Sequence, residues 1–377
     1  MLWQFGFLDV WQRNIFGGDF SQFWAGARVY VTGGDPYDPS TWPGRVQQLG
    51  GQDPVTPVFL YPPWVLFVLA PLGFLELPVA ASVWIGSTLI FAAVGLFLLL
   101  DLRVRDLPLA HTLVAFALVG SQPGIVNFYS GQWSFFLIGA LSLSALYASR
   151  RRQSLAALFS SAILIKPQLF LVAAPMLLRI AVARGQRRLA LGLVALGAWA
   201  ALASAIVFPR WWEPWSSVPA DRVGNIRAAS LPNAMRDIFG EAGLVTAVAV
   251  LLVLIALALA FSPRSDAAWP VWVGVSLNVA PYVFVYDQVI LLVPLAVAAG
   301  IIGRDLPGRS LVVTAVGVAT LVVGGTFLHA FPGVTHGTLS YNGFVQFAVA
   351  LLLIGALWRY RREPAVDPSG AGTGRVS

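Results

Sequence analysis

The chain has 377 residues, of which 58% are hydrophobic and only 11% are charged, and its mean hydropathy is +0.76. Soluble globular proteins carry about 25% charged residues, so this composition excludes a soluble domain and predicts an integral membrane protein. The net charge of +7 comes from arginine clusters between apolar runs, a pattern typical of cytoplasmic loops rather than of a nucleic-acid-binding surface. The chain has no cysteine, which excludes disulfides and thiol catalysis.

The first notable stretch, "GGDFSQFWAGARVY", places Asp19 in front of several aromatic residues. Apolar residues at helical spacing predict an amphipathic helix over 20–31. Gln22 completes the Asp-x-x-Gln pattern of a capping box, so Asp19 has a structural explanation as well as a chemical one. Residues 1–17 have no signal-peptide pattern. We expect either a further helix upstream of this stretch or an N-terminal segment that dips into the interface without crossing.

Two further segments belong to the same polar region. Residues 33–39, "GGDPYDP", have the composition of a turn. Residues 61–76, "YPPWVLFVLAPLGFLE", are apolar, short and interrupted by proline, and no basic residue flanks them. We interpret 61–76 as an interfacial helix rather than a span.

The rest of the chain carries the membrane spans. Runs that approach the roughly 20 residues needed to cross a bilayer as a helix lie at 78–100, 107–120, 133–149, 189–208, 242–262, 310–328 and 342–358. Shorter or proline-interrupted candidates lie at 154–165, 167–178, 268–283 and 288–303. Such broken helices persist only where protein or a water-filled cavity satisfies the freed backbone groups. The prediction is an all-α polytopic membrane protein with about eleven spans, or twelve with an upstream helix.

The arginines predict the orientation. Arginine clusters follow the apolar runs near 103–105, 150–152, 179–188, 304–309 and 359–362, and the positive-inside rule places them in the cytoplasm together with the C-terminus. The loop 209–241 has as many acids as arginines and is expected outside. The first external loop, 17–77, and the loop 209–241 would then cover one membrane domain, 1–363. The composition of the tail 364–377 predicts a disordered segment, and the orientation places it in the cytoplasm.

Lys166 is the only lysine of the chain, and it lies in the apolar stretch "SSAILIKPQLFLVAAP". Ionisable groups at membrane depth are costly and usually face a cavity or a partner. The competing interpretation is that its long side chain extends to the interface. Pro167 directly after it predicts a turn between 154–165 and 167–178.

Polar side chains other than arginine concentrate on the predicted outer face, so we expect the function there. A carboxylate, a few cations and several tyrosines suit glycosyl transfer from a lipid-linked sugar phosphate. The acceptor hydroxyl needs a general base, and a departing phosphate needs a cation. The sequence contains no nucleotide-binding motif, and a lipid-linked donor does not require one.

The motifs also resemble a known family. "GGDFSQFWAGARVYVTGGDPYDP", "FLYPPWVLFVLAPLGFL", "NFYSGQWSFFLIGAL", "ILIKPQLFLVAAP", "SLPNAMRDIFG" and "YDQVILLVPLA" occur in the order found in glycosyltransferase family 87. That family includes polyprenyl-phosphate-mannose-dependent α-1,2-mannosyltransferases and belongs to the GT-C superfamily. The resemblance spans roughly residues 17 to 300. It implies a catalytic Asp in the first external loop, just after the first membrane helix, and juxtamembrane helices in that loop.

The resemblance and the residues together give a site hypothesis. Asp19 is the expected general base, with Asp35 and Asp38 in reserve. Lys166, Arg236 and His336 are the expected ligands of the donor phosphate, although Arg236 has the alternative role of a salt bridge within its loop. The expected substrate-binding residues are Asp35, Tyr37, Asp38, Tyr61, Gln132 and Asp287. The acidic groups of the first loop would allow a divalent cation without requiring one.

The predicted enzyme is a hexosyltransferase that moves a sugar, expected to be mannose, from a polyprenyl-phosphate donor to a lipid or glycan acceptor with inversion. Its partners are the donor, the acceptor and the bilayer of the cell membrane. Two alternatives remain open: a secondary transporter or flippase for a lipid-linked sugar, since broken helices and a buried lysine suit that class too, and a catalytically inactive relative that binds a polyprenyl lipid.

Overall fold

A computed structural model describes residues 19–49, 57–104, 107–216, 230–260, 268–280, 283–330, 343–358 and 360. Every regular element within these ranges is a helix, which confirms the predicted all-α class. In chain order the helices are α2 (Asp19–Val31), α3 (Trp42–Gln48), α4 (Pro63–Leu69), η1 (Ala70–Phe74), α5 (Leu77–Val104), α6 (Pro108–Gly120), α7 (Gln122–Ser130), α8 (Ser134–Ser149), α9 (Gln153–Ser160), η2 (Ser161–Ile165), η3 (Pro167–Phe170), α10 (Ala173–Ala183), α11 (Arg187–Val207), α12 (Trp212–Ser216), α14 (Leu231–Leu259), α15 (Ala268–Val279), η4 (Val285–Leu291), α16 (Leu292–Gly303), α17 (Pro307–Ala330) and α18 (Gly343–Leu357).

Each of the eleven predicted apolar segments corresponds to a helix or to a pair of helices. Within the described ranges, five helices are long and apolar enough to cross a bilayer: Leu77–Leu102, Arg187–Val207, Leu231–Leu259, Val285–Gly303 and Pro307–Gly324. A sixth span arises if α6 and α7, which meet at an angle of 48°, are counted as one. The other predicted spans correspond to shorter helices, so the multi-pass class is confirmed and the number eleven stays a prediction.

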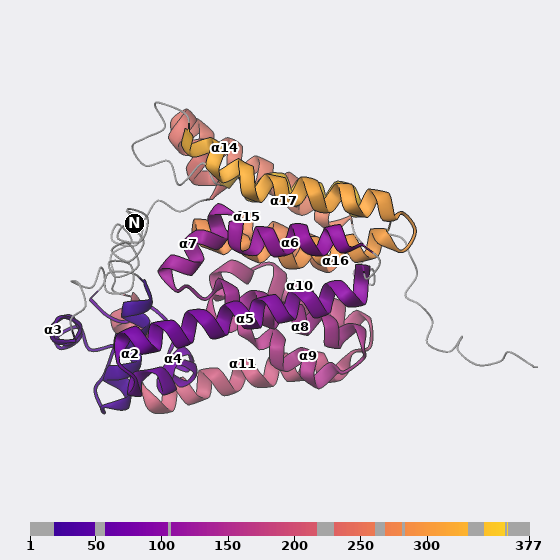
Figure 1. Cartoon of the computed structure of the whole chain (residues 1–377). Coiled ribbons are helices and arrows are strands. Elements are labelled where there is room, and N and C mark those ends of the chain that lie inside the picture. Colours follow the sequence, from indigo (N-terminus) through magenta and orange to yellow (C-terminus); the bar gives the residue numbers. More distant parts are fainter. Residues whose placement is uncertain are drawn as a thin grey trace, which may run out of the picture.

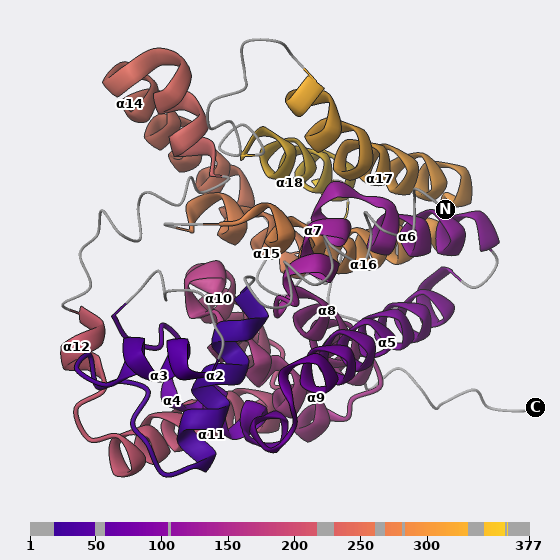
Figure 2. The same ribbon diagram turned by 60° about the vertical axis from the view of Figure 1, so that its left-hand side comes forward.

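The long helices lie side by side in one bundle, with the short helices α2, α3 and α4 grouped at one end of it (Figures 1 and 2). Helices α5, α8 and α16 pack against one another, and α16 is buried from Leu292 to Ile302. A helix that is apolar on all sides is expected in the centre of a bundle. The bundle therefore supports, at one end, the part of the chain that carries half of the predicted site residues.

Helix α2 is fixed to the segment that follows α4. The indole of Trp24 donates to the carbonyl of Leu75 at 2.9 Å, and the guanidinium of Arg28 donates to the carbonyl of Gly73 at 2.9 Å. Glycine at position 73 allows this segment to approach α2 closely, since a Cβ there would lie 2.7 Å from the backbone of Ala27. Helices α4 and η1 have seven and five residues, too few to span. This agrees with the interpretation of 61–76 as a segment that does not cross the membrane.

The structure differs from the sequence prediction at the end of the 209–241 loop. Helix α14 begins at Leu231, where the hydroxyl of Ser230 accepts from the backbone N–H of Asn233 at 3.4 Å, and Pro232 follows in the first turn. The polar residues of "NAMRD" therefore lie on a helix rather than in a loop. Gly240, at φ 63° and ψ −148°, kinks this helix before its apolar part begins.

Candidate active site

Asp19 is the first described residue of α2, and its carboxylate contacts a different element of the fold. Its Oδ2 accepts a hydrogen bond from Nε2 of Gln132 at 2.5 Å. Burial raises the pKa of this carboxyl above its ordinary value of 3.8. The hydrogen bond from Gln132 and the charge of Lys166 oppose this rise, whereas the charge of Asp287 adds to it. Asp19 thus interacts with residues that are 113 or more positions away in the sequence. A residue that only caps its own helix would not need such distant partners.

Gln132 is placed by a turn that only glycine can make comfortably. Helix α7 ends at Ser130, and Gly131 follows in the left-handed region at φ 63° and ψ 34°. A Cβ on Gly131 would lie 2.7 Å from Cβ of Phe20, the neighbour of Asp19. The indole of Trp84 fixes the turn by donating to the carbonyl of Gly131 at 2.8 Å. The end of α7 can therefore approach the start of α2 closely enough for Gln132 to reach Asp19.

Tyr61 completes this group. Its hydroxyl donates to Oε1 of Gln132 at 3.5 Å, the long limit of a hydrogen bond. Its ring packs edge-on against Phe23 of α2, with ring centres 5.0 Å apart. The amide of Gln132 thus has Asp19 on one side and Tyr61 on the other, so its orientation is fixed by both partners.

Lys166 lies between η2 and η3 and is buried together with Asp287 of η4. Its Nζ is 2.8 Å from Oδ1 of Asp287, and the two side chains are only 3% and 1% exposed. Nζ also lies 4.7 Å from the centre of the Tyr286 ring, which suits a cation–π contact. The interpretation in which Lys166 extends to the interface is therefore wrong: the side chain turns inward because a carboxylate is available there.

Asp287 has several partners besides Lys166. Its Oδ1 also accepts from the hydroxyl of Ser134 at 3.0 Å, and its Oδ2 accepts from the backbone N–H of Phe284 at 3.1 Å. A buried ion pair offsets its desolvation cost only with such additional hydrogen bonds. These contacts fix the carboxylate and, through it, the position of the ammonium group.

The beginning of α8 connects the two groups. Gln132 binds Asp19 and Ser134, two residues later, binds Asp287. The charges of Lys166 and Asp287 also act on the Asp19 carboxyl. The structure thus brings together five of the predicted site residues, which come from five separate segments of the chain: Asp19, Tyr61, Gln132, Lys166 and Asp287.

Asp35 and Asp38 have local partners in the first loop, and Arg236 lies on a different helix. Asp38 accepts from the backbone and hydroxyl of Ser40 at 2.9 and 2.6 Å and from the hydroxyl of Thr41 at 2.9 Å, so its carboxylate holds a turn. Asp35 is exposed and accepts from the backbone N–H of Tyr37 at 2.8 Å. Arg236 is exposed on α14, and His336 lies outside the described residues.

Tyr37 is buried and connects its turn to the site. Its hydroxyl donates to the carbonyl of Tyr61 at 2.5 Å, and burial raises its pKa well above the ordinary value of 10.0. The phenol therefore stays protonated and acts as a hydrogen-bond donor. Tyr37 supports the backbone of the residue whose side chain contacts Gln132.

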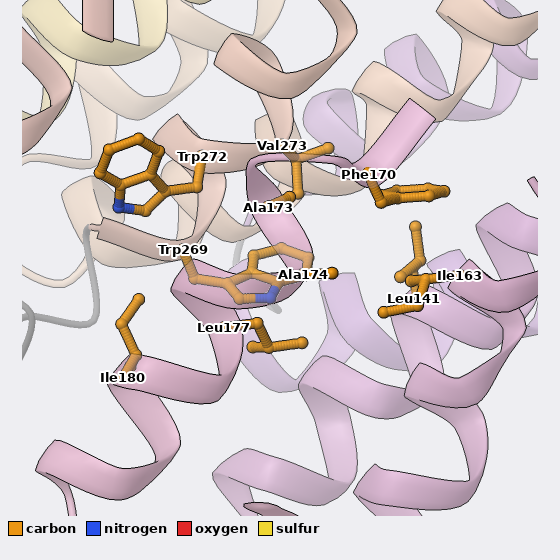
Figure 3. Close-up of a pocket in the computed structure, with 10 residues that line it drawn as sticks. All are labelled: Leu141, Ile163, Phe170, Ala173, Ala174, Leu177, Ile180, Trp269, Trp272 and Val273. Carbon is orange, nitrogen blue, oxygen red and sulfur yellow. The ribbon is translucent and has the colours of Figure 1, made fainter. Parts of the chain in front are cut away.

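A small apolar pocket opens beside the Lys166 turn, among α8, α10 and α15 (Figure 3). Its free volume is about 10 Å³, roughly what one water molecule needs. Its lining is aliphatic and aromatic, and the side chains shown from Ile163 and Phe170 come from the two turns that flank Lys166. As it stands, this pocket is too small for an isoprenoid unit.

The described ranges contain no group of three or more His, Asp or Glu side chains that could hold a metal ion. Sequence reasoning also missed contacting residues. Ser134 could have been found from its position two residues after Gln132. Trp64, whose indole donates to the carbonyl of Leu164 at 3.0 Å beside the Lys166 turn, has no sequence signal that separates it from other aromatic residues of the first loop.

Comparison with known proteins gives one match. The model of glycosyltransferase family 87 matches residues 59–285, more than half of the chain. The matched region contains Tyr61, Gln132 and Lys166, while Asp19 and Asp287 lie on either side of it. No curated protein sequence and no solved structure matches the chain.

Proposed function

The chain belongs to glycosyltransferase family 87 and is a membrane glycosyltransferase, and from this premise we propose that it transfers a sugar from a polyprenyl-phosphate donor with Asp19 as general base. The observation that carries the proposal is the pairing of two groups: a partly desolvated carboxylate, Asp19, within electrostatic reach of a buried ammonium, Lys166. A base and a cation in one cluster are what transfer from a sugar phosphate requires.

In the proposed reaction, Asp19 takes the proton from an acceptor hydroxyl. The hydroxyl oxygen forms a bond to the anomeric carbon while the bond from that carbon to the phosphate oxygen breaks. The electron pair leaves with the polyprenyl phosphate, and attack opposite the leaving group inverts the anomeric configuration. Asp19 works only when deprotonated, and its raised pKa makes it a stronger base than an exposed carboxylate.

Lys166 is proposed to stabilise the charge that develops on the phosphate. An ammonium group has three donors, and one of those of Lys166 is directed at Asp287. Asp287 therefore positions Lys166 and leaves donors for a phosphate oxygen. Arg236 and His336 remain proposed as additional phosphate ligands. Tyr61 and Gln132 are proposed to line the sugar site beside Asp19.

The donor sugar is proposed to be mannose and the acceptor a lipid or glycan at the extracytoplasmic face of the cell membrane. The grouping of α2, α3 and α4 at one end of the bundle supports a single catalytic face (Figure 1). Binding energy from the long polyprenyl chain would add to that of the phosphate.

The test is transfer from radiolabelled polyprenyl-phosphate-mannose to a lipid-linked acceptor by the purified protein in nanodiscs. Asp19→Asn keeps the size of the side chain and removes the base, so turnover is expected to fall by about 10²–10⁴-fold. Circular dichroism and thermal unfolding show whether the variant is folded. A folded Asp19→Asn variant with turnover near that of the wild type would contradict the assignment.

Glu241→Gln is a matched control, because it removes an exposed carboxylate from α14, away from the cluster. It is expected to leave turnover unchanged. If the wild type consumes no polyprenyl-phosphate-mannose, the same assay with polyprenyl-phosphate-glucose separates a wrong sugar from a wrong donor class.

A further inference from the structure

Tyr286 is a buried phenol beside the Lys166–Asp287 ion pair. It is only 9% exposed and precedes Asp287 in η4. The Nζ atom of Lys166 lies 4.7 Å from the centre of its ring. We propose that Tyr286 is a further catalytic residue, whose hydroxyl donates a hydrogen bond to the phosphate of the sugar donor next to Lys166. This inference rests on the proposed function.

The ring of Tyr286 has two neighbours that fix its place. The ring of Phe284 stacks on it, with the ring centres 5.2 Å apart and the planes at 22°. The ammonium group of Lys166 lies over the ring, where the negative face of an aromatic system attracts a cation. That ammonium group is itself held by Asp287 at 2.8 Å. Because a phenol hydroxyl lies in the plane of its ring, these contacts also determine where the hydroxyl points.

The phenol of Tyr286 is within electrostatic reach of both halves of the cluster. The charges of Asp19 and Asp287 act on it, and so does the phenol of Tyr61. Asp19 and Tyr61 belong to one half, whereas Asp287 belongs to the other half with Lys166. The reacting bond of the donor must lie between the same two halves. Its anomeric carbon has to meet the hydroxyl activated by Asp19, while its phosphate has to meet Lys166.

The hydroxyl of Tyr286 is free to bind a ligand. Among the described residues, none forms a hydrogen bond with it. The nearby carboxylates have other donors: Asp287 accepts from three groups and Oδ2 of Asp19 accepts from one. The hydroxyls of Tyr37 and Tyr61, by contrast, both have an acceptor. A buried tyrosine hydroxyl usually has a partner, so a ligand that brings an acceptor oxygen to Tyr286 would satisfy it.

A phosphate group suits the two donors together. It presents several strong acceptor oxygens, so one oxygen can accept from Lys166 while another accepts from Tyr286. The phenol adds a donor without adding a charge, and it therefore does not compete with Lys166 for Asp287.

The hydrogen bond from Tyr286 would also favour the departure of the phosphate. When the bond to the anomeric carbon breaks, the electron pair leaves with the polyprenyl phosphate, which gains negative charge. A hydrogen bond to an oxygen strengthens as that oxygen becomes more negative. The phenol keeps its proton throughout. Loss of the hydroxyl should therefore lower kcat more than it weakens binding of the donor.

Tyr286→Phe tests the hydroxyl alone, because it keeps the ring that packs against Lys166 and Phe284. In transfer from polyprenyl-phosphate-mannose, kcat should fall by about 10–100-fold, the factor expected for a hydrogen bond to a charged group. KM for the acceptor should stay as in the wild type. The dissociation constant of polyprenyl phosphate, measured in nanodiscs, should rise by up to about tenfold, while that of uncharged polyprenol should not change.

Tyr147→Phe is the matched control. The ring of Tyr147 also stacks on a phenylalanine, Phe159, with centres 5.6 Å apart, but it lies in the last turn of α8, whereas Ser134 in the first turn contacts Asp287. This variant should keep the kcat and the polyprenyl phosphate affinity of the wild type.

Two results would overturn the inference and leave the proposed function intact. The first is a folded Tyr286→Phe variant with unchanged kcat and unchanged affinity for polyprenyl phosphate. The second is a shift of the acid limb of kcat/KM without a change in that affinity, because the hydroxyl would then act on Asp19 and not on the phosphate. A wild type that neither prefers polyprenyl phosphate over polyprenol nor uses a polyprenyl-phosphate sugar would instead contradict the proposed function.

If Tyr286→Phe does not fold, 3-fluorotyrosine at position 286 provides the test. It keeps the ring and the hydroxyl and makes the hydroxyl a stronger hydrogen-bond donor. Below the pKa of the fluorophenol, tighter binding of polyprenyl phosphate than in the wild type would support the inference, and an unchanged affinity would contradict it.

Discussion

Two aspartates of the same polar region, Asp19 at the start of α2 and Asp38 in the turn before α3, have opposite environments. Burial raises the pKa of the Asp19 carboxyl, and one amide from a distant segment binds it. Asp38 is accessible to water, and the hydrogen bonds from Ser40 and Thr41 lower the pKa of its carboxyl. The sequence offers both as candidates for the base. Only Asp19 combines desolvation with a nearby cation.

The two environments separate the proposed chemical role of Asp19 from the structural role of Asp38. A carboxylate whose donors come from the next three residues can hold a turn anywhere on a surface. A carboxylate whose partners come from segments more than a hundred residues away depends on the whole bundle.

The largest effect is expected from Lys166→Met, which removes the cation near Asp19. It leaves the buried carboxylate of Asp287 without its partner, so the free energy of unfolding should fall by about 3–5 kcal/mol. The double variant Lys166→Met/Asp287→Asn should recover most of that stability but not the use of the donor. Thermal unfolding in detergent and transfer kinetics measure the two effects. A single variant as stable as the wild type would show that the pair is not buried.

A smaller effect is expected from Gln132→Met, which keeps the volume and removes the hydrogen bond to Asp19. That hydrogen bond lowers the pKa of Asp19, so its loss should raise the pKa further. Because the base acts deprotonated, activity is lost as the pH falls through this pKa. The acid limb of kcat/KM should therefore move to higher pH. Gln48→Met on the exposed face of α3 is the control, and an unmoved acid limb in Gln132→Met would remove Asp19 from the role of base.

The smallest effect is expected from Asp38→Asn. The amide oxygen can still accept from Ser40, while the amide nitrogen that replaces Oδ2 can no longer accept from Thr41. Only a turn is affected, so transfer should continue, in contrast with Asp19→Asn. The lowered pKa of Asp38 means that its ionised form stabilises the fold above the ordinary carboxyl range, and that this contribution is lost as the pH falls through the folded-state pKa. The difference in Tm between the wild type and Asp38→Asn should accordingly shrink at acid pH. A large loss of transfer would return Asp38 to the catalytic candidates.

The apolar helices could be predicted because burial in a membrane requires long apolar runs, and every predicted run corresponds to helical structure. The first turns of α14 could not be predicted, because "NAMRD" has the composition of a loop. It is helical because Ser230 caps the helix and Pro232 lies in its first turn. Composition also suggested that Lys166 is special, since it is the only lysine and lies among apolar residues. Its partner could not be inferred, since Asp287 lies 121 positions away and only the packing of η4 against the Lys166 turn brings the two side chains together.

The pairing of the site residues depends on packing, which a sequence pattern does not encode. In the sequence Gly131 resembles any glycine at the end of a helix. Only the structure shows that a Cβ at this position would lie too close to Phe20. An open cleft is likewise formed by Asp35 and Tyr37 of the first loop together with Phe208 and Arg210, which lie far from them in the sequence. The positions of the helices could therefore be predicted from propensity and composition. The contacts between the ends of those helices could be seen only in the structure.

The ion pair between Lys166 and Asp287 also has a consequence for biosynthesis. The two residues are 121 positions apart, and ribosomes add about 5–20 residues per second, so roughly 6–24 seconds pass between the synthesis of the lysine and that of its carboxylate. During that interval Asp287 cannot stabilise the ammonium. Lys166 must therefore be solvated by water or bound to another group until η4 has been synthesised. The proposed site can therefore form only after η4 has been synthesised, and a chain that ends before Asp287 cannot carry it.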